Sequence, residues 1–171
     1  MDQDIYNALR AFDSVWQRVG GGSGDAFSSC AAEPERTDGP DGDARQLREF
    51  MDAEYMSASF YTALASRVSG RQRALLLQAA CDEKKHLRRL QLEYYLLTGE
   101  TWSAPRYEND RSGVLSQLRT AYLTEMKTAD GYRSAARQTE NAELAALWTE
   151  IASDEDRHAA AARQMTAAAL R

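Results

Sequence analysis

Cysteine, proline and long apolar runs are scarce in this sequence, and each shortage excludes a class of protein. The two cysteines, Cys30 and Cys81, lie far apart and form no Cys-x-x-Cys, which excludes a zinc ribbon, a rubredoxin-type iron site and a thioredoxin motif. No stretch approaches the roughly 18 apolar residues of a membrane-spanning helix, so no membrane partner is expected. After Asp43 the only proline is Pro105, so little interrupts long helices there.

Positive charge is also in short supply. The formal net charge is -5 and the sequence pI is about 5.1, which disfavours nucleic acid as a partner. The first residues, Met-Asp-Gln-Asp, have no basic region followed by an apolar run, so we expect a cytoplasmic protein without a secretory signal. Cys81 stands in an apolar helical stretch and is expected to be buried, whereas Cys30 is expected to be an exposed thiol in a polar segment.

Three segments differ in composition. Residues 1–19 repeat apolar side chains at helical spacing and predict an amphipathic helix. Residues 20–42 are rich in Gly, Ser, Ala, Asp and Pro and predict a flexible linker. Residues 43–171 are rich in Leu, Ala, Glu, Arg and Gln and show none of the alternation typical of strands, so they predict an all-α domain.

Four helices account for that domain, and the links between them predict how it folds. The expected helices run from Asp43 to Val68, from Arg71 to Thr98, from an N-cap at Ser112 to Gln138, and from 142 almost to Arg171. The short links near 69–70 and 139–141 make each pair an antiparallel hairpin. The connection at 100–111 can stretch to roughly 40 Å, and a helix of about 27 residues has the same length. It therefore predicts a crossover along the bundle, with an up-down-up-down arrangement as the alternative.

Each predicted helix has a buried face at spacings of three and four, and a carboxylate interrupts the middle of each face. The expected faces contain Leu47, Met51, Glu54, Ala58, Tyr61, Ala65, Val68; Leu76, Ala79, Glu83, His86, Leu90, Glu93 or Tyr94, Leu97; Leu115, Leu118, Tyr122, Glu125, Ala129, Tyr132, Ala136; and Leu144, Trp148, Ile151, Glu155, His158, Ala162, Met165, Ala169. An uncompensated buried carboxylate costs several kcal/mol. No Lys or Arg lies on these faces near their centres, so a pair of divalent cations is the expected compensation.

The carboxylates are expected to meet at one height in the bundle. Glu54 and His86 lie equally far from the link at residue 70, Glu54 before it and His86 after it. Glu83 also follows the link and lies slightly nearer to it. Glu125 and Glu155 lie equally far from the link at residue 140, one before it and one after it. Side chains at equal distances from a hairpin turn come to the same level, because both helices rise equally per residue.

The two hairpins also repeat each other. The first half has Glu54-x3-Ala58-x2-Tyr61 and Glu83-Lys-Lys-His86, and the second has Glu125-x3-Ala129-x2-Tyr132 and Glu155-Asp-Arg-His158. The chain contains only two histidines, and both have a glutamate three positions before them. This repeat predicts a pseudo-twofold site with two equivalent metal positions.

With these motifs the sequence resembles the ferritin-like di-metal carboxylate superfamily, and within it the rubrerythrin-like proteins, over about residues 43–170. The resemblance implies that Glu83 and Glu155 bridge two metal ions, and that one ion each is bound terminally by Glu54, Glu125, His86 and His158. It also implies that Tyr61 and Tyr132 hydrogen-bond to ligand carboxylates; plain packing in the core is their alternative role. The sequence departs from rubrerythrins in lacking the four-cysteine rubredoxin domain, and in having Thr128 where they usually have an additional glutamate.

Mixed carboxylate and imidazole ligands suit two iron ions, with manganese as the alternative. We predict a non-haem di-iron oxidoreductase that uses an external redox donor protein to reduce hydrogen peroxide, or that oxidises Fe(II) with dioxygen or peroxide. A homodimer or larger homo-oligomer is expected. The alternatives are an iron-storage or ferroxidase subunit of a larger assembly, manganese catalase chemistry, and a metal-free helical interaction module.

Overall fold

The computed structural model describes residues 40–170, and in this range the chain forms four α-helices and no strand. The helices are α2 (Pro40–Ala65), α3 (Gly70–Thr98), α4 (Val114–Gln138) and α5 (Ala142–Ala169). The predicted all-α bundle is therefore confirmed. The predicted helix at 1–19 lies outside the described residues, as does the predicted linker except for residues 40–42, which belong to α2.

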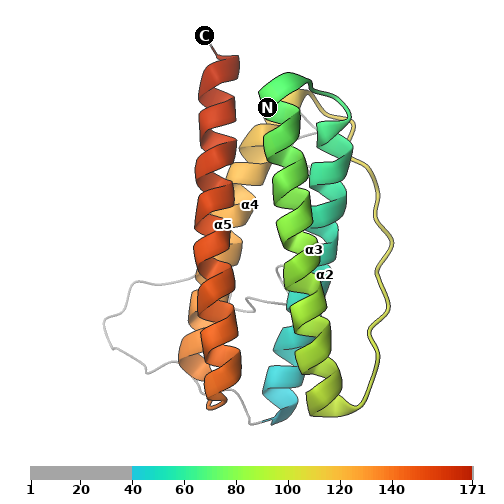
Figure 1. Cartoon of the computed structure of the whole chain (residues 1–171), viewed down its shortest axis with the longest axis vertical. Helices are drawn as coiled ribbons and strands as arrows, with labels where there is room; N and C mark the ends of the chain where they lie inside the picture. The colour runs from blue at the N-terminus through green and yellow to red at the C-terminus, as the bar shows by residue number, and fades with distance from the viewer. Residues whose placement is uncertain (1–39, 171) are drawn as a thin grey trace, which may run out of the picture.

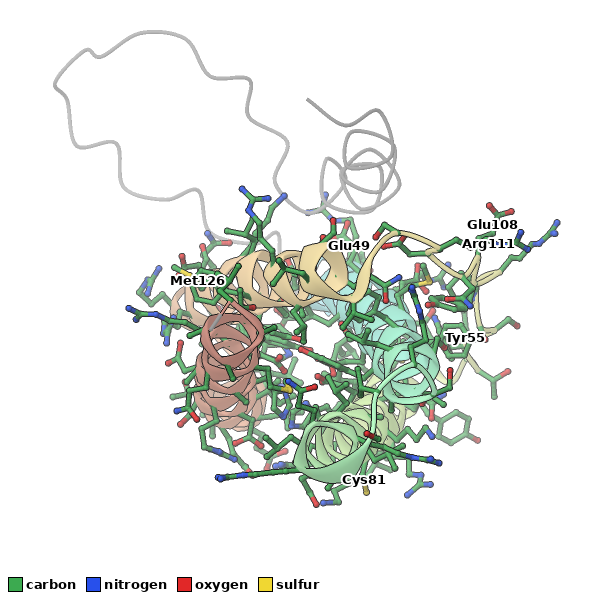
Figure 2. All side chains as sticks on the ribbon, turned by 90° about the horizontal axis from the view of Figure 1, so that it is seen from above. Glu49, Tyr55, Cys81, Glu108, Arg111 and Met126 are labelled. Carbon is green, nitrogen blue, oxygen red and sulfur yellow. The ribbon has the colours of Figure 1, made fainter. Side chains whose placement is uncertain are left out.

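The helices pair as two antiparallel hairpins, α2 with α3 and α4 with α5 (Figure 1). The segment 99–113 leaves the end of α3, runs along the outside of the bundle and enters α4 at the opposite end (Figure 1). The predicted crossover is thus confirmed, and the up-down-up-down alternative is wrong. Seen along its axis, the bundle is a ring in which α3 also faces α5, and α2 also faces α4 (Figure 2).

The crossover is attached to α2 near one end and to the turn that follows α2 near the other. Trp102 packs edge-on against Tyr55, with 5.9 Å between the ring centroids, and its indole N–H donates to Asp52 at 2.8 Å. At the other end, the Arg67 guanidinium donates to the backbone carbonyl of Ser112 at 2.7 Å. The connection is therefore fixed along the outer side of α2.

Several helix boundaries differ from those expected: α2 begins at Pro40 rather than Asp43, and α3 begins at Gly70 rather than Arg71. α2 ends at Ala65 rather than Val68 because the next two backbone N–H groups bond three residues back, at 3.2 and 3.0 Å, and tighten the chain into a turn. Ser112 is not the N-cap of α4, which Gly113 provides. The backbone N–H and hydroxyl of Ser112 instead donate to the Asp110 carboxylate at 2.8 and 2.9 Å, which closes a turn within the crossover.

The buried apolar side chains form two clusters at opposite ends of the bundle. The lower cluster consists of Leu47, Phe50, Met51, Leu90, Tyr94, Tyr132, Ala135, Leu144, Leu147, Trp148, Ile151 and Ala152. The upper cluster consists of Phe60, Tyr61, Leu64, Ala65, Leu76, Ala79, Ala80, Leu118, Ala121, Ala162 and Met165. A polar layer of buried carboxylates and imidazoles separates the two clusters.

Most of the positions expected to face inward are buried. Of the two candidates for one inward position, Glu93 and Tyr94, Tyr94 is the buried one. The clear exceptions are Leu115 and Ala169, which lie at helix ends and are exposed. None of the helices in residues 40–170 combines the length and apolar character needed to cross a membrane.

The expected burial of Cys81 is wrong. Ala79, Ala80 and Glu83 are buried on one face of α3, and Cys81 lies about 100° farther round the helix from Ala80. It shares the outer side with Leu77, four residues earlier, which is 43% exposed. Figure 2 shows Cys81 on the outer rim of the bundle.

Candidate metal centre

All six side chains predicted as metal ligands meet in the polar layer between the two clusters. Each is at most 8% exposed: Glu54, Glu83, His86, Glu125, Glu155 and His158. Their ligand atoms form two groups of four, and within each group the atoms lie within 4.8 Å of one another. We call Glu54, Glu83, His86 and Glu155 the His86 half-site, and Glu83, Glu125, Glu155 and His158 the His158 half-site. Glu83 and Glu155 belong to both.

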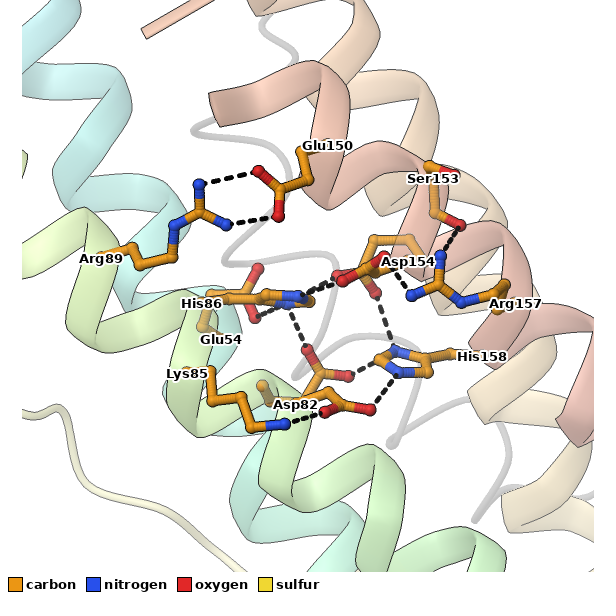
Figure 3. Close-up of polar contacts among 12 residues, drawn as sticks. Glu54, Asp82, Lys85, His86, Arg89, Glu150, Ser153, Asp154, Arg157 and His158 are labelled. Carbon is orange, nitrogen blue, oxygen red and sulfur yellow. Dashed lines mark hydrogen bonds and ion pairs between the residues drawn. The ribbon is translucent and has the colours of Figure 1, made fainter. Parts of the chain in front are cut away.

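One ring nitrogen of each histidine points into this cluster (Figure 3). His86 Nδ1 lies 3.3 Å from a carboxylate oxygen of each of Glu54, Glu83 and Glu155. His158 Nδ1 lies 3.0 Å from Glu83 Oε1 and 3.5 Å from Glu155 Oε2. The two imidazole rings are 6.2 Å apart between centroids, so each nitrogen serves its own half-site.

The other ring nitrogen of each histidine faces an aspartate that the sequence reasoning missed. His86 Nε2 lies 3.0 Å from Asp154 Oδ2, and His158 Nε2 lies 3.8 Å from Asp82 Oδ2 (Figure 3). Each aspartate directly precedes the Glu of one Glu-x-x-His and faces the histidine of the other. A carboxylate at Nε2 favours the proton on that nitrogen, which leaves the Nδ1 lone pair free to bind a metal ion. The signal in the sequence was an Asp before both motifs.

Both aspartates are themselves held by a cation three residues farther along the helix. Lys85 donates to Asp82 at 2.7 Å, and Arg157 pairs with Asp154. Burial tends to raise the pKa of Asp82, but hydrogen bonds from Lys85 and Gln78 hold it below its usual value. Lys85 is exposed, yet it has this defined role at the edge of the site.

The two tyrosines of the repeat donate hydrogen bonds across the hairpins. Tyr61 of α2 donates to Glu125 Oε1 of α4, and Tyr132 of α4 donates to Glu54 Oε1 of α2. Burial, together with the charges of the neighbouring carboxylates, raises the pKa of both hydroxyls well above its usual value. Both tyrosines are therefore protonated donors that fix one oxygen of each lone glutamate.

The buried carboxylates of the cluster repel one another, and this repulsion changes the pKa values of the cluster. Burial and the charges of Glu54 and Glu125 raise the pKa of Glu83 to about 8. Burial and the charge of Glu155 also raise the pKa of Glu125 well above its usual range. For His158, burial would lower the pKa, but Glu155 and Glu83 outweigh it and raise the pKa to about 11. Without metal, the cluster therefore compensates its own negative charge by retaining protons.

The donor set fits metal ions because several of its buried polar atoms lack partners. Glu83 Oε1, Glu125 Oε2, Glu155 Oε1 and His158 Nδ1 are buried and form no hydrogen bond. Glu83 Oε1 and His158 Nδ1 lie close together, but not with the geometry of a hydrogen bond. Buried polar atoms without partners are rare in folded proteins. Carboxylate oxygens and imidazole nitrogens converging in this way are suited to iron or manganese.

Comparison with known proteins agrees with this architecture. Residues 42–168 match the ferritin-like domain family, and the chain belongs to that family. Among curated proteins, the uncharacterised protein YhjR of Bacillus subtilis is 28% identical over 116 residues, which cover 67% of this chain and 80% of YhjR. The expected membership of the ferritin-like superfamily is therefore confirmed.

Two solved structures share the fold. A hypothetical protein from Pyrococcus furiosus superposes with a TM-score of 0.65 at 20% identity, covering 72% of this chain and 87% of that protein. A ferritin-like, diiron-carboxylate protein from Bacillus anthracis superposes with a TM-score of 0.63 at 22% identity, covering 74% of this chain and 96% of that protein. At these identities the likeness concerns the fold alone.

Proposed function

We propose that this chain is a di-iron protein of rubrerythrin-like type that reduces hydrogen peroxide with electrons from an external donor protein, or that oxidises Fe(II) with dioxygen or peroxide. The observation that carries the proposal is that two sets of four buried donors share Glu83 and Glu155. Two shared carboxylates suit a bridging role between two ions, and the remaining donors suit terminal ligands: Glu54, His86, Glu125 and His158.

The residues around the donors support the same assignment. The backing of each imidazole by an aspartate is the arrangement that fixes the tautomer and ring orientation of histidine ligands. Tyr61 and Tyr132 hold the lone glutamates and are the proposed proton-bearing groups next to the ligands. Thr128, the position where rubrerythrins usually have a further glutamate, donates its hydroxyl to the Thr124 backbone carbonyl at 3.0 Å and offers no carboxylate. The proposed centre therefore has six protein ligands.

Two ferrous ions held here would supply two electrons, enough to convert one hydrogen peroxide and two protons to two waters and leave two ferric ions. The chain must then be reduced again by another molecule, because its two cysteines cannot form a rubredoxin-type centre. The carboxylate and imidazole donors would keep both ions in place through this cycle. The Bacillus anthracis relative, described as a diiron-carboxylate protein, supports iron over manganese.

The test is a metal count followed by a stoichiometric oxidation. We expect two iron ions per chain after iron-replete expression, and, in the anaerobic ferrous protein, consumption of one peroxide for every two ions oxidised. The double variant Glu83→Gln, Glu155→Gln serves as the metal-deficient control, and Glu150→Gln as the matched surface control. Manganese in place of iron, with two peroxides consumed per dioxygen released, would indicate catalase chemistry. A metal content near zero would contradict the proposal and favour a metal-free interaction module.

A further inference from the structure

A small cavity lies between α2 and α4, beside the metal centre. Its volume is about 10 Å³, which is room for one very small molecule. It is lined by Ser57, Phe60, Thr120, Ala121, Thr124 and Glu125. Glu125 is the lone glutamate of the His158 half-site, so the cavity reaches a proposed metal ligand directly.

The exposed lining of this cavity is almost wholly apolar, although three of its residues carry hydroxyls and one is a carboxylate. Glu125 is 1% exposed; Tyr61 donates to its Oε1, whereas its Oε2 has no hydrogen-bond partner. Three of the other lining residues are Ser57, Thr120 and Thr124, and none of the rest is charged. A mostly apolar cavity of this size suits a small neutral molecule rather than a hydrated metal ion, which would favour an acidic entrance.

The equivalent position beside Glu54 is filled. The repeat aligns Glu54 with Glu125, and the same offset aligns Phe50 with Ala121. Phe50 is fully buried and stacks on Tyr132 at 3.8 Å between centroids. Both oxygens of Glu54 have partners, in Tyr132 and His86. The His86 half-site is therefore packed with aromatic rings where the His158 half-site has a cavity.

Polar contacts cover the opposite side of the centre, between α3 and α5. Arg89 forms two hydrogen bonds with Glu150, at 2.7 and 2.8 Å (Figure 3). The aspartates that back the two histidines lie on the same side, each held by its own cation. A neutral molecule approaching from there would have to separate these charged pairs.

We propose that the cavity between α2 and α4 is the port through which a neutral molecule of at most two heavy atoms, hydrogen peroxide or dioxygen, reaches the His158 half-site. This inference rests on the proposed function and specifies its substrate class. Ala121 keeps the port open, whereas Phe50 closes the equivalent position. Organic peroxides and hydrocarbons are too large for the cavity and are not substrates.

Nitric oxide tests the port without turnover, because it is a neutral diatomic molecule that binds ferrous ions. The variant Ala121→Phe copies the closed half-site, and Ala121→Val closes the cavity with less added volume. We expect the rate of nitric oxide association with the diferrous protein to fall about tenfold or more in both, with two iron ions retained. Ala121→Ser, which adds a single atom, is the matched control and should keep the association rate within about twofold.

A widening variant tests the opposite direction. Thr120→Ala enlarges the cavity and should accelerate nitric oxide association. If both closing variants lose iron, the proposal is tested by Thr120→Ala alone. An unchanged association rate in Thr120→Ala would then overturn the proposed port. An unchanged rate in iron-loaded Ala121→Phe or Ala121→Val also overturns it and places the route beside Asp82 and Asp154. If the wild-type chain binds no iron, the proposed function fails and the inference fails with it.

Discussion

The two half-sites have the same ligand pattern but different surroundings. In the His86 half-site, both oxygens of Glu54 are hydrogen-bonded, and the stacked rings of Phe50 and Tyr132 pack beside it. In the His158 half-site, one oxygen of Glu125 has no hydrogen-bond partner, and Glu125 lines a small cavity together with Ala121. The comparison teaches that a repeated motif fixes which atoms converge, whereas single apolar residues outside the motif decide whether anything else can enter.

The two histidines also differ in how closely carboxylates surround them. The Nε2 of His86 is within hydrogen-bond distance of Asp154, at 3.0 Å, whereas the Nε2 of His158 is 3.8 Å from Asp82. His86 Nδ1 also has three carboxylate oxygens at 3.3 Å, compared with two near His158 Nδ1. We therefore regard the His86 half-site as the more firmly held of the two.

The largest effect is expected from removing a carboxylate that the half-sites share. Glu83→Gln or Glu155→Gln should abolish binding of both ions, because each half-site loses a donor, whereas Glu54→Gln or Glu125→Gln should leave one ion bound. Elemental analysis of the purified variants measures this directly. Retention of one ion in Glu83→Gln would show that the half-sites do not share this ligand. Circular dichroism separates metal loss from unfolding.

Acidification should weaken metal binding to both half-sites steeply. The raised pKa values of Glu83, about 8, and His158, about 11, mean that both groups carry a proton at neutral pH without metal and must release it on binding. Affinity therefore falls as pH decreases below 8, by about tenfold per pH unit for each displaced proton. Above pH 8 the proton of Glu83 no longer contributes, whereas that of His158 still does. Calorimetry in buffers of different ionisation enthalpy counts the protons; a count of zero would contradict the prediction.

The aspartates offer a smaller effect that should distinguish the half-sites. Asp154→Ala and Asp82→Ala should each weaken binding of one ion by about 10- to 100-fold, because the ring they orient becomes free to rotate. The loss should be greater for Asp154, which lies closer to its histidine. Asp156→Ala, at an exposed neighbouring position, is the matched control. Competition with a chelator measures both constants, and equal losses would remove this difference between the half-sites.

The smallest effect concerns the tyrosine hydroxyls and the stability of the metal-free chain. Tyr61→Phe and Tyr132→Phe each remove a hydrogen bond to a buried carboxylate, a loss of about 1.5–3 kcal/mol in the free energy of unfolding. Tyr61→Phe should cost more, because Glu125 then has no partner, whereas Glu54 keeps His86. Urea denaturation measures the difference, with the exposed Tyr95→Phe as control. A greater loss for Tyr132→Phe would mean that Glu54 depends more on its hydroxyl.

Helical spacing was sufficient to predict the bundle, the crossover and the convergence of the six buried donors. It succeeds because the period of the helix and the link lengths determine which side chains reach the same level on the inner face. It failed at Cys81 because an apolar run contains residues on every side of a helix. It failed at Ser112 because a nearby Asp110 competes for the groups that would cap the helix.

The contacts between hairpins were beyond the same reasoning. Asp154 reaches His86 only because α5 packs beside α3, which no spacing along one helix reveals. The cavity was equally hidden, since Phe50 and Ala121 are both simply apolar residues of a buried face. Aligning the two halves of the sequence on their lone glutamates is the operation that would have shown this difference.

The crossover contributes no donor to the metal centre, and its two attachments lie on either side of Pro105. A chain cut there would consist of two fragments, each with one lone glutamate and one Glu-x-x-His. Neither fragment could complete a half-site alone, because each half-site takes ligands from both hairpins. The connection therefore acts as a tether that raises the effective concentration of one hairpin for the other. Metal would then be the agent that drives the separated fragments to associate.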